Sequence, residues 1–262
     1  MASEPDILIV EDSPTQALLL RHMLAPYAYP VAIARSGEEA LARIRERPPA
    51  LVISDYIMPG INGRNLCLQI RQDPALKAIP FLLMTAQSDS IEGLAPPDQG
   101  GPDAILIKPV TREQLDQTLA PRLPRKQSFP VSSESALPGA GSLLEPDLPV
   151  FDGRRLKENL SGDLRLYNKI ITAFFEECPK QLAHLERAFA DSNRHAVELM
   201  AHSIKGSATT LGGERLRVAA MLMEKAARSA EWSQLHGMRA QLRQEYERLN
   251  AALAPDLSGE RG

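Results

Sequence analysis

Two segments of the chain carry side chains that are able to accept a phosphoryl group. His202 is followed by Lys205 and Gly206, so that on a helix an imidazole, an ammonium group and a residue without a side chain share one face. Asp55 stands at the end of an apolar run, where its carboxylate would leave a strand. An imidazole attacks phosphorus as a nucleophile, and a nearby cation neutralises the phosphoryl oxygens. Two acceptors of different type predict a protein that takes up a phosphoryl group and passes it on.

Three carboxylates are expected to meet near Asp55. Glu11 and Asp12 end the first apolar run, and Thr85 and Lys108 end two later ones. In a parallel sheet all of these positions fall at the carboxyl edge of the strands, where ligands bind. Carboxylates this close need a cation, and a site with oxygen ligands suits Mg²⁺. Thr85 would add a hydroxyl donor, and Lys108 an ammonium to neutralise phosphoryl charge.

The elements that position this cluster are short apolar runs separated by segments of helical period. Such alternation predicts an α/β fold, a doubly wound five-stranded parallel sheet with about five helices, over residues 1–123. Ser13 and Pro14 are expected to begin the first helix, over 15–25, as its cap and first residue. A second helix is expected over 37–47, and the expected strands are 7–10, 31–34, 51–54, 81–85 and 105–107.

A change in composition divides the chain after this region. Residues 124–149 are rich in proline, serine and glycine and predict a flexible linker, which would span roughly 25–30 Å as a coil. Residues 150–255 carry only helical patterns and predict an all-α four-helix bundle with an additional N-terminal turn. Helices are expected near 153–160, 164–177, 179–191, 194–211, 214–229 and 232–253, with Pro179 as a break or as a kink in one long helix. Residues 256–262 are expected to form a disordered tail.

Composition excludes several classes of protein. The 262 residues carry a formal net charge of −3 without a basic stripe, which argues against nucleic-acid binding. The first residues lack the basic pattern of a signal peptide, and the apolar runs are too short for membrane insertion, so we expect a cytoplasmic location. Met1 lies close to the first strand, which favours a free-standing protein. Cys67 and Cys178 lie too far apart in sequence to suggest a zinc site.

The first region resembles the receiver domain of two-component response regulators, which has a flavodoxin-like fold. The resemblance covers about residues 5–123 and rests on Glu11-Asp12, on Asp55 followed by Met58-Pro59 and Gly63, on Thr85-Ala86 and on Lys108-Pro109. It implies that Asp55 is the phosphoacceptor. Asp12 would bind Mg²⁺ directly, Glu11 through water and Ile57 through its carbonyl oxygen, while Thr85 and Lys108 would sense the phosphoryl group. A cis Lys108-Pro109 bond is also expected.

Two positions depart from that family pattern. Ile105 stands where receivers commonly carry an aromatic residue that couples to the threonine, so aromatic switching is not expected here. The segment 89–102, where a fourth helix would lie, contains prolines and glycines that should stop a helix near Leu94. Both departures favour a receiver whose output is the phosphoryl group itself.

The second region resembles the histidine phosphotransfer domain over about residues 151–253. His202 matches the phosphorylated residue, Lys205 and Gly206 match their family positions, and Leu211-Gly212-Gly213 and Met223-Glu224 resemble downstream ones. On a helix an apolar stripe would face the bundle core and leave His202 exposed on the far side; its members are Val197, Met200, Ala201, Ile204, Ala208 and Leu211. The four other histidines are expected to be ordinary polar residues.

These features predict a phosphorelay intermediate with no ATP-binding kinase domain. A sensor histidine kinase would phosphorylate Asp55, the group would move to His202, and His202 would serve a further response regulator receiver domain, or receive from it. In a second version Asp55 acts only as a switch or phosphate sink. The alternative from another class is a binding regulator of a kinase or other partner, in which His202 never carries phosphate. A phosphatase is disfavoured because Ile57 stands where such enzymes place a second acid.

Overall fold

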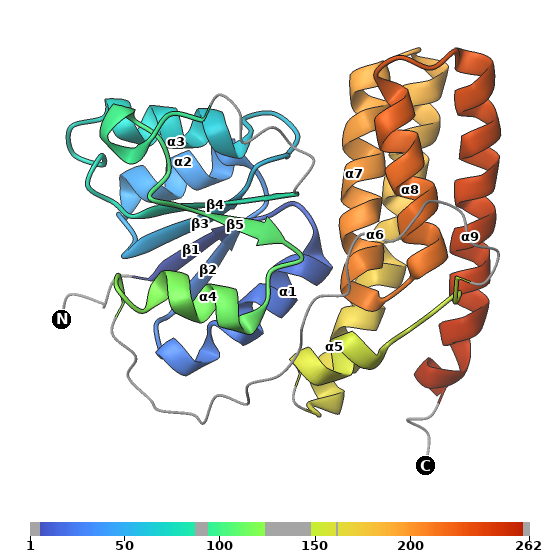
Figure 1. The fold of residues 1–262 in the computed structure, drawn as a ribbon, viewed down its shortest axis with the longest axis horizontal. Coiled ribbons are helices and arrows are strands. Elements are labelled where there is room, and N and C mark those ends of the chain that lie inside the picture. Colours follow the sequence, from blue (N-terminus) through green and yellow to red (C-terminus); the bar gives the residue numbers. More distant parts are fainter. Residues whose placement is uncertain (1–5, 87–93, 124–147, 161, 259–262) are drawn as a thin grey trace.

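The computed structural model describes residues 6–86, 94–123, 148–160 and 162–258, which form two domains (Figure 1). The first contains a five-stranded parallel sheet in the order β2-β1-β3-β4-β5. All five expected strands are confirmed, each within one residue of its predicted bounds: β1 (Ile7–Val10), β2 (Val31–Ala34), β3 (Leu51–Asp55), β4 (Phe81–Ala86) and β5 (Ala104–Lys108).

Helices cover both faces of this sheet, so the residues of β1, β3 and β4 are almost all buried. Helices α1 (Pro14–Met23) and α4 (Arg112–Leu119) lie on one face, and α2 (Gly37–Glu46) and α3 (Gly63–Gln72) on the other (Figure 1). Each face has its own core of buried side chains, centred on Tyr27 and Leu106 on the α1 side and on Ile44 and Phe81 on the α2 side. The doubly wound fold is therefore confirmed.

Helix α1 begins as the sequence predicts. Ser13 has an extended backbone and its Oγ accepts a hydrogen bond from the Gln16 amide, while Pro14 occupies the first helical position. The capping residue Ser13 directly follows Asp12, which lies just beyond the end of β1. Helix α1 therefore begins next to the carboxylates at this end of the sheet.

The stretch between β4 and β5 differs from an ordinary α/β repeat. Residues 94–103 contain only the 3₁₀ turn η2 (Pro97–Gln99), and the residues expected to hold a short helix, 89–93, lie outside the described part of the chain. The described receiver region thus has four α-helices and two 3₁₀ turns, the other being η1 (Ala25–Tyr27), where about five helices were expected.

The second domain consists of a short helix α5 (Arg154–Asn159) and four longer ones, α6 (Leu164–Ala190), α7 (Arg194–Leu211), α8 (Glu214–Ala227) and α9 (Trp232–Ser258). The four-helix bundle is confirmed. Pro179 lies inside α6, so a single helix replaces the two expected ones. Buried residues on both sides of the proline, Phe174 and Leu185 among them, tie both halves of α6 to one core. Helix α9 continues three residues into the expected tail.

The bundle core is joined to the first domain through α1. The core includes Ile170, Phe174, Ile204 and Met223 of the bundle helices, and Leu18 and Leu19 of α1 pack against it from outside. Helix α1 accordingly contacts both α6 and α7, and it lies between the sheet and the bundle in Figure 1.

Candidate phosphotransfer site

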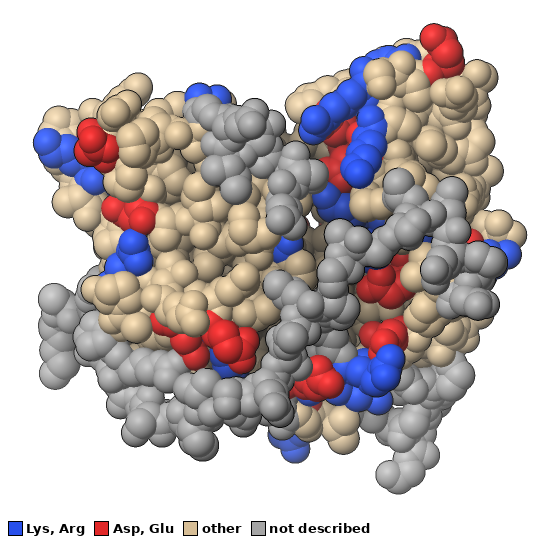
Figure 2. All heavy atoms as spheres, viewed as in Figure 1, with Lys and Arg blue, Asp and Glu red and all other residues tan. Residues whose placement is uncertain are grey.

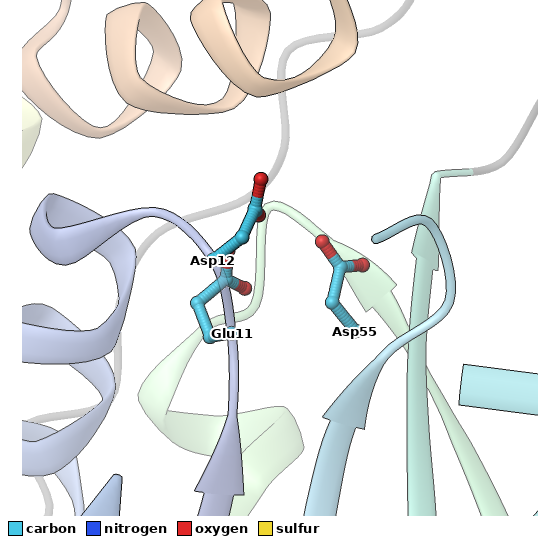
Figure 3. Close-up of side chains that lie close together, drawn as sticks. All are labelled: Glu11, Asp12 and Asp55. Atoms are coloured by element: carbon cyan, nitrogen blue, oxygen red, sulfur yellow. The ribbon is translucent and has the colours of Figure 1, made fainter. Parts of the chain in front are cut away.

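The three carboxylates predicted to converge do so at the carboxyl edge of the sheet. Val10 pairs with Ser54 across β1 and β3, so the residues that follow these two positions leave the sheet at the same level. Glu11, Asp12 and Asp55 each place a carboxylate oxygen within 4.8 Å of the other two (Figure 3). Glu11 and Asp55 are buried and Asp12 is half-buried.

Lys108 is the cation of this cluster. Its Nζ lies 2.7 Å from Oδ2 of Asp55 and 3.1 Å from Oε2 of Glu11. Burial opposes the charged form of the lysine, but the two carboxylates outweigh it and raise the pKa of Lys108 above its ordinary value. The Lys108-Pro109 bond is cis, as expected.

Two further predicted residues stand beside the cluster. Thr85 lies near the end of β4, next to Met84, which pairs with Asp55 across the ladder, and its side chain is buried. Ile57 lies two residues beyond Asp55, half-buried in the loop that follows β3. Both are therefore at the sheet edge, where the sequence places them.

One lysine does not balance three carboxylates. Burial, with the charges of Asp55 and Asp12 added, raises the pKa of Glu11 to about 8 even though Lys108 acts in the opposite direction. Burial also raises the pKa of Asp12, again with a contribution from Asp55. A bound divalent cation would favour the ionised form of a carboxyl group whose pKa is raised by burial and by neighbouring negative charge.

The donor set fits a hard cation. Every side-chain ligand in the cluster is a carboxylate oxygen, the type that Mg²⁺ and Ca²⁺ prefer, with no cysteine or histidine among the grouped ligands. Three acidic side chains cannot fill an octahedral shell, which leaves room for water or phosphoryl oxygens.

His202 is placed differently from the expectation. The predicted apolar stripe of α7 does face the bundle core, with five of its six members fully buried and Met200 partly so. His202 points off that core, but it is only 5 % exposed, so the prediction of an exposed imidazole is wrong. Helical periodicity located the polar face of α7 correctly. It could not show that Glu224 and the first domain cover this face.

A buried acid, Glu224 of α8, organises the histidine. Its Oε1 lies 2.6 Å from Nδ1 of His202, and its Oε2 lies 2.7 Å from Nζ of Lys205. Burial would raise the pKa of Glu224, but the hydrogen bond with His202 and the charge of Lys205 lower it overall. The carboxylate is therefore ionised at neutral pH and accepts from both neighbours.

This pairing fixes the tautomer of the imidazole. A carboxylate only accepts, so Nδ1 carries the proton that it donates to Glu224, and Nε2 has the free lone pair. Lys205 Nζ also lies 3.4 Å from Nδ1, but it is much closer to the carboxylate, which is its partner. Nε2 is thus the ring nitrogen whose lone pair is free to react. Sequence reasoning noted Glu224 as a match to a family position and assigned it no role.

The acidic cluster of the first domain meets the helix that carries His202 at the domain boundary. Gln181 donates to Oγ of Ser203 at 2.8 Å, which leaves the Ser203 hydroxyl hydrogen available for the Asp12 carboxylate. A hydrogen bond from Ser203 acts to lower the pKa of Asp12, against its burial, and His202 lies close enough to interact electrostatically with the same carboxylate. In Figure 3 the Asp12 carboxylate points toward the helices of the second domain.

A second polar contact joins the domains one turn further along α7. Oγ of Ser13 and Oγ of Ser207 lie 3.0 Å apart and both are buried. Gly206 stands beside the Gln16 side chain, whose amide a Cβ at this position would meet. None of Ser13, Gln16, Ser203 and Ser207 was predicted as part of a site, because their roles depend on a contact between distant segments.

Among the described residues no helix has the length and apolarity needed to cross a membrane. On the face shown in Figure 2, acidic and basic side chains lie side by side in both domains, without a continuous basic surface.

Comparison with known proteins identifies both domains. Residues 7–120 match the response regulator receiver domain and residues 169–252 match the Hpt domain. Protein PilH of Pseudomonas aeruginosa is 35 % identical over 113 residues, which are 43 % of this chain and 93 % of that protein. The phosphate regulon transcriptional regulatory protein PhoB of Rhizobium meliloti is 35 % identical over 114 residues, 42 % of this chain but only 48 % of that protein.

Two similar solved structures each match less than half of the length of this chain. The receiver domain of a signal transduction histidine kinase from Syntrophus aciditrophicus is 33 % identical, with a TM-score of 0.39, and the match covers 49 % of this chain and 99 % of that one. Chemotaxis response regulator CheY4 of Vibrio cholerae is 28 % identical, with a TM-score of 0.39, over 46 % of this chain and 99 % of that one.

The fold and the acidic edge define a signalling protein with a phosphoacceptor receiver. The chain belongs to the response regulator receiver family and carries an Hpt domain behind its receiver. A receiver and an Hpt domain in one chain fit a phosphorelay intermediate of two-component signal transduction.

Proposed function

We propose that Asp55 and His202 of one chain exchange a phosphoryl group directly. The observation that carries this proposal is the contact between their surroundings: Asp12, a member of the Asp55 cluster, interacts with both Ser203 and His202 of the second domain. This contact brings the Asp55 cluster against the turn of α7 that carries His202.

The transfer step follows from the hydrogen bonds. Nε2 of His202 attacks the phosphorus of the Asp55 acyl phosphate, the N–P bond forms, and the P–O bond to the carboxyl breaks with its electron pair returning to Asp55. The imidazole then bears a positive charge and retains its proton on Nδ1, where the ionised Glu224 stabilises it. Lys205 and Lys108 stand on opposite sides of the boundary to neutralise phosphoryl oxygens. The reverse step uses the same groups.

The proposed metal is Mg²⁺, held by Glu11, Asp12 and Asp55, with the Ile57 carbonyl as a further ligand. When bound, it neutralises charge on the phosphoryl oxygens and on the crowded carboxylates. Thr85 adds a hydroxyl at the same edge. The grouping of carboxylate oxygens within 4.8 Å supports this assignment.

The proposed partners are a sensor histidine kinase that supplies the group to Asp55 and another receiver domain that exchanges it with His202. The presence of both acceptor domains supports this position in a relay. A cytoplasmic location stays a prediction.

The test uses a labelled small-molecule phosphodonor such as acetyl phosphate and the full-length chain. Acyl phosphate is labile to base, whereas phosphohistidine is labile to acid and survives base. We expect base-stable label in the wild type, and none in Asp55→Ala or His202→Ala. Label confined to Asp55 in the wild type would refute the exchange and favour a regulator that acts through its receiver alone.

A further inference from the structure

Residues of the receiver lie against the face of α7 that carries His202. His202 lies off the bundle core, and within the bundle Glu224 engages its Nδ1 atom. The groups next to it along α7 are covered from the receiver side, Gly206 by Gln16 and Ser207 by Ser13. Asp12 adds a contact with Ser203, so residues 12, 13 and 16 of the receiver lie against positions 203, 206 and 207, on the turn of α7 that follows His202.

Helix α1 also anchors this arrangement. Leu18 and Leu19 pack against the bundle core, and Leu19 also packs against the receiver core beneath α1. The start of α1, with its cap, makes the polar contact with α7, and the middle of the same helix makes the apolar contact with the bundle core. The receiver thus contacts the bundle through α1, the helix that directly follows Glu11 and Asp12.

We propose that this contact is a closed state in which His202 is accessible only to Asp55 of its own chain. This proposal rests on the proposed exchange between Asp55 and His202. Release of α1 from α7 is then the step that exposes His202 to a separate receiver domain. Two receivers cannot occupy one face of α7, so internal and external transfer exclude each other. The relay becomes sequential: the chain loads His202 while closed and unloads it while open.

Chemical accessibility of His202 tests the closed state without any phosphorylation. Diethyl pyrocarbonate modifies accessible imidazoles, and trypsin releases His202 in the same peptide as the exposed His195, an internal reference. We compare the wild type with Leu18→Asp, which places a charge in the apolar contact, and with Leu164→Asp, the same change at a side chain that is 66 % exposed. The radius of gyration from small-angle scattering reports separation of the domains.

The expected result is at least a tenfold faster modification of His202 in Leu18→Asp, with a larger radius of gyration, while Leu164→Asp behaves like the wild type. Equal reactivity of His202 in a separated Leu18→Asp chain would show that the bundle alone protects it and would overturn the proposal. A Leu18→Asp chain that stays compact, with His202 still unreactive, would also overturn the proposal. The two domains would then be held together without the apolar contact of α1.

A chain held in the closed state by a disulfide tests whether closure blocks phosphoryl transfer from His202 to a separate receiver. The Ser13→Cys/Ser207→Cys double variant places two thiols where the hydroxyl oxygens are 3.0 Å apart, so that oxidation ties α1 to α7. The acceptor is full-length His202→Ala/Leu18→Asp, which has Asp55 but no histidine to relay onward. We expect the phosphorylated donor to transfer at least tenfold faster when reduced than when oxidised. Equal rates would overturn the gate, whereas a donor that never carries label on His202 would instead refute the proposed function.

Discussion

Nδ1 of His202 lies 2.6 Å from Oε1 of Glu224, so the buried carboxylate holds one ring nitrogen and leaves Nε2 as the atom that can attack phosphorus. The same carboxylate binds Lys205 through its other oxygen at 2.7 Å. A residue of α8 therefore orients both candidate functional side chains of α7.

Removal of this carboxylate should slow transfer without abolishing the acceptor. We expect Glu224→Ala to reduce the rate of Asp55-to-His202 transfer by about 10- to 100-fold, the loss seen when a group that orients a metal-binding histidine is removed. Glu224→Gln, which keeps an acceptor oxygen but loses the charge, should lie between. The measurement is single-turnover transfer of label. Glu198→Ala is the matched control, since Glu198 lies on α7 and pairs with Arg228 on the outside of the bundle; similar losses in both variants would contradict a specific role for Glu224.

The sequence predicts the residues of the sheet edge and of the His202 helix face, but not the contact between His202 and Glu224. Glu11, Asp12, Asp55, Thr85 and Lys108 each end an apolar run, and a parallel sheet brings strand ends together whatever the rest of the chain does. Lys205 and Gly206 follow His202 at helical spacing, which is again a local relationship. The partnership with Glu224, 22 positions further on, depends on how α8 packs against α7, and no local pattern encodes that.

Pro179 and the burial of His202 are two further features that depend on packing between distant segments and not on local sequence. A proline predicts a break or a kink, and only the shared core decides that α6 stays one helix. A polar helical face predicts exposure to solvent unless another domain covers it. Here the covering residues, Ser13 and Gln16, are more than 180 positions away from the face that they cover.

Gly206 should tolerate a small side chain and reject a long one. A Cβ there meets the end of the flexible Gln16 side chain, which can move aside. Gly206→Ala should therefore leave transfer within about threefold of the wild type and stabilise α7 by up to about 1 kcal/mol. Gly206→Gln should slow internal transfer at least tenfold, because its side chain fills the space between α1 and α7. Thermal unfolding and single-turnover transfer measure the two effects. Transfer at the wild-type rate in Gly206→Gln would mean that the domains need not approach this closely.

Binding of Mg²⁺ should depend on pH in a defined direction. The cation competes with the proton that burial retains on Glu11, whose pKa is raised to about 8. Affinity should therefore rise by up to about tenfold per pH unit between pH 6 and 8 and level off above that, as expected for displacement of one proton. Titration calorimetry at pH 6, 7, 8 and 9 measures this. Asp12→Asn should weaken binding at every pH, while Glu39→Gln, at an exposed pair with Arg43, should not change it. A flat pH profile would contradict the assignment of Glu11 to the site.

The two thiols should be inert in the folded protein. Burial raises the pKa of Cys67 to about 11 and raises that of Cys178 as well, so both stay protonated near neutral pH. We expect neither to react with an aromatic disulfide reagent at pH 8 within an hour, and both to react after denaturation in guanidinium chloride. Rapid reaction of one thiol in the native protein would show that its surroundings open readily.

The concentration dependence of transfer tests the exchange between Asp55 and His202 most directly. Chains labelled on Asp55 in the absence of excess donor are diluted over a hundredfold range, and the appearance of base-stable label on His202 is followed in a single turnover. Exchange within one chain predicts a rate constant that does not change with protein concentration. A rate that falls in proportion to dilution would show that Asp55 and His202 meet only between chains, and would contradict exchange within one chain.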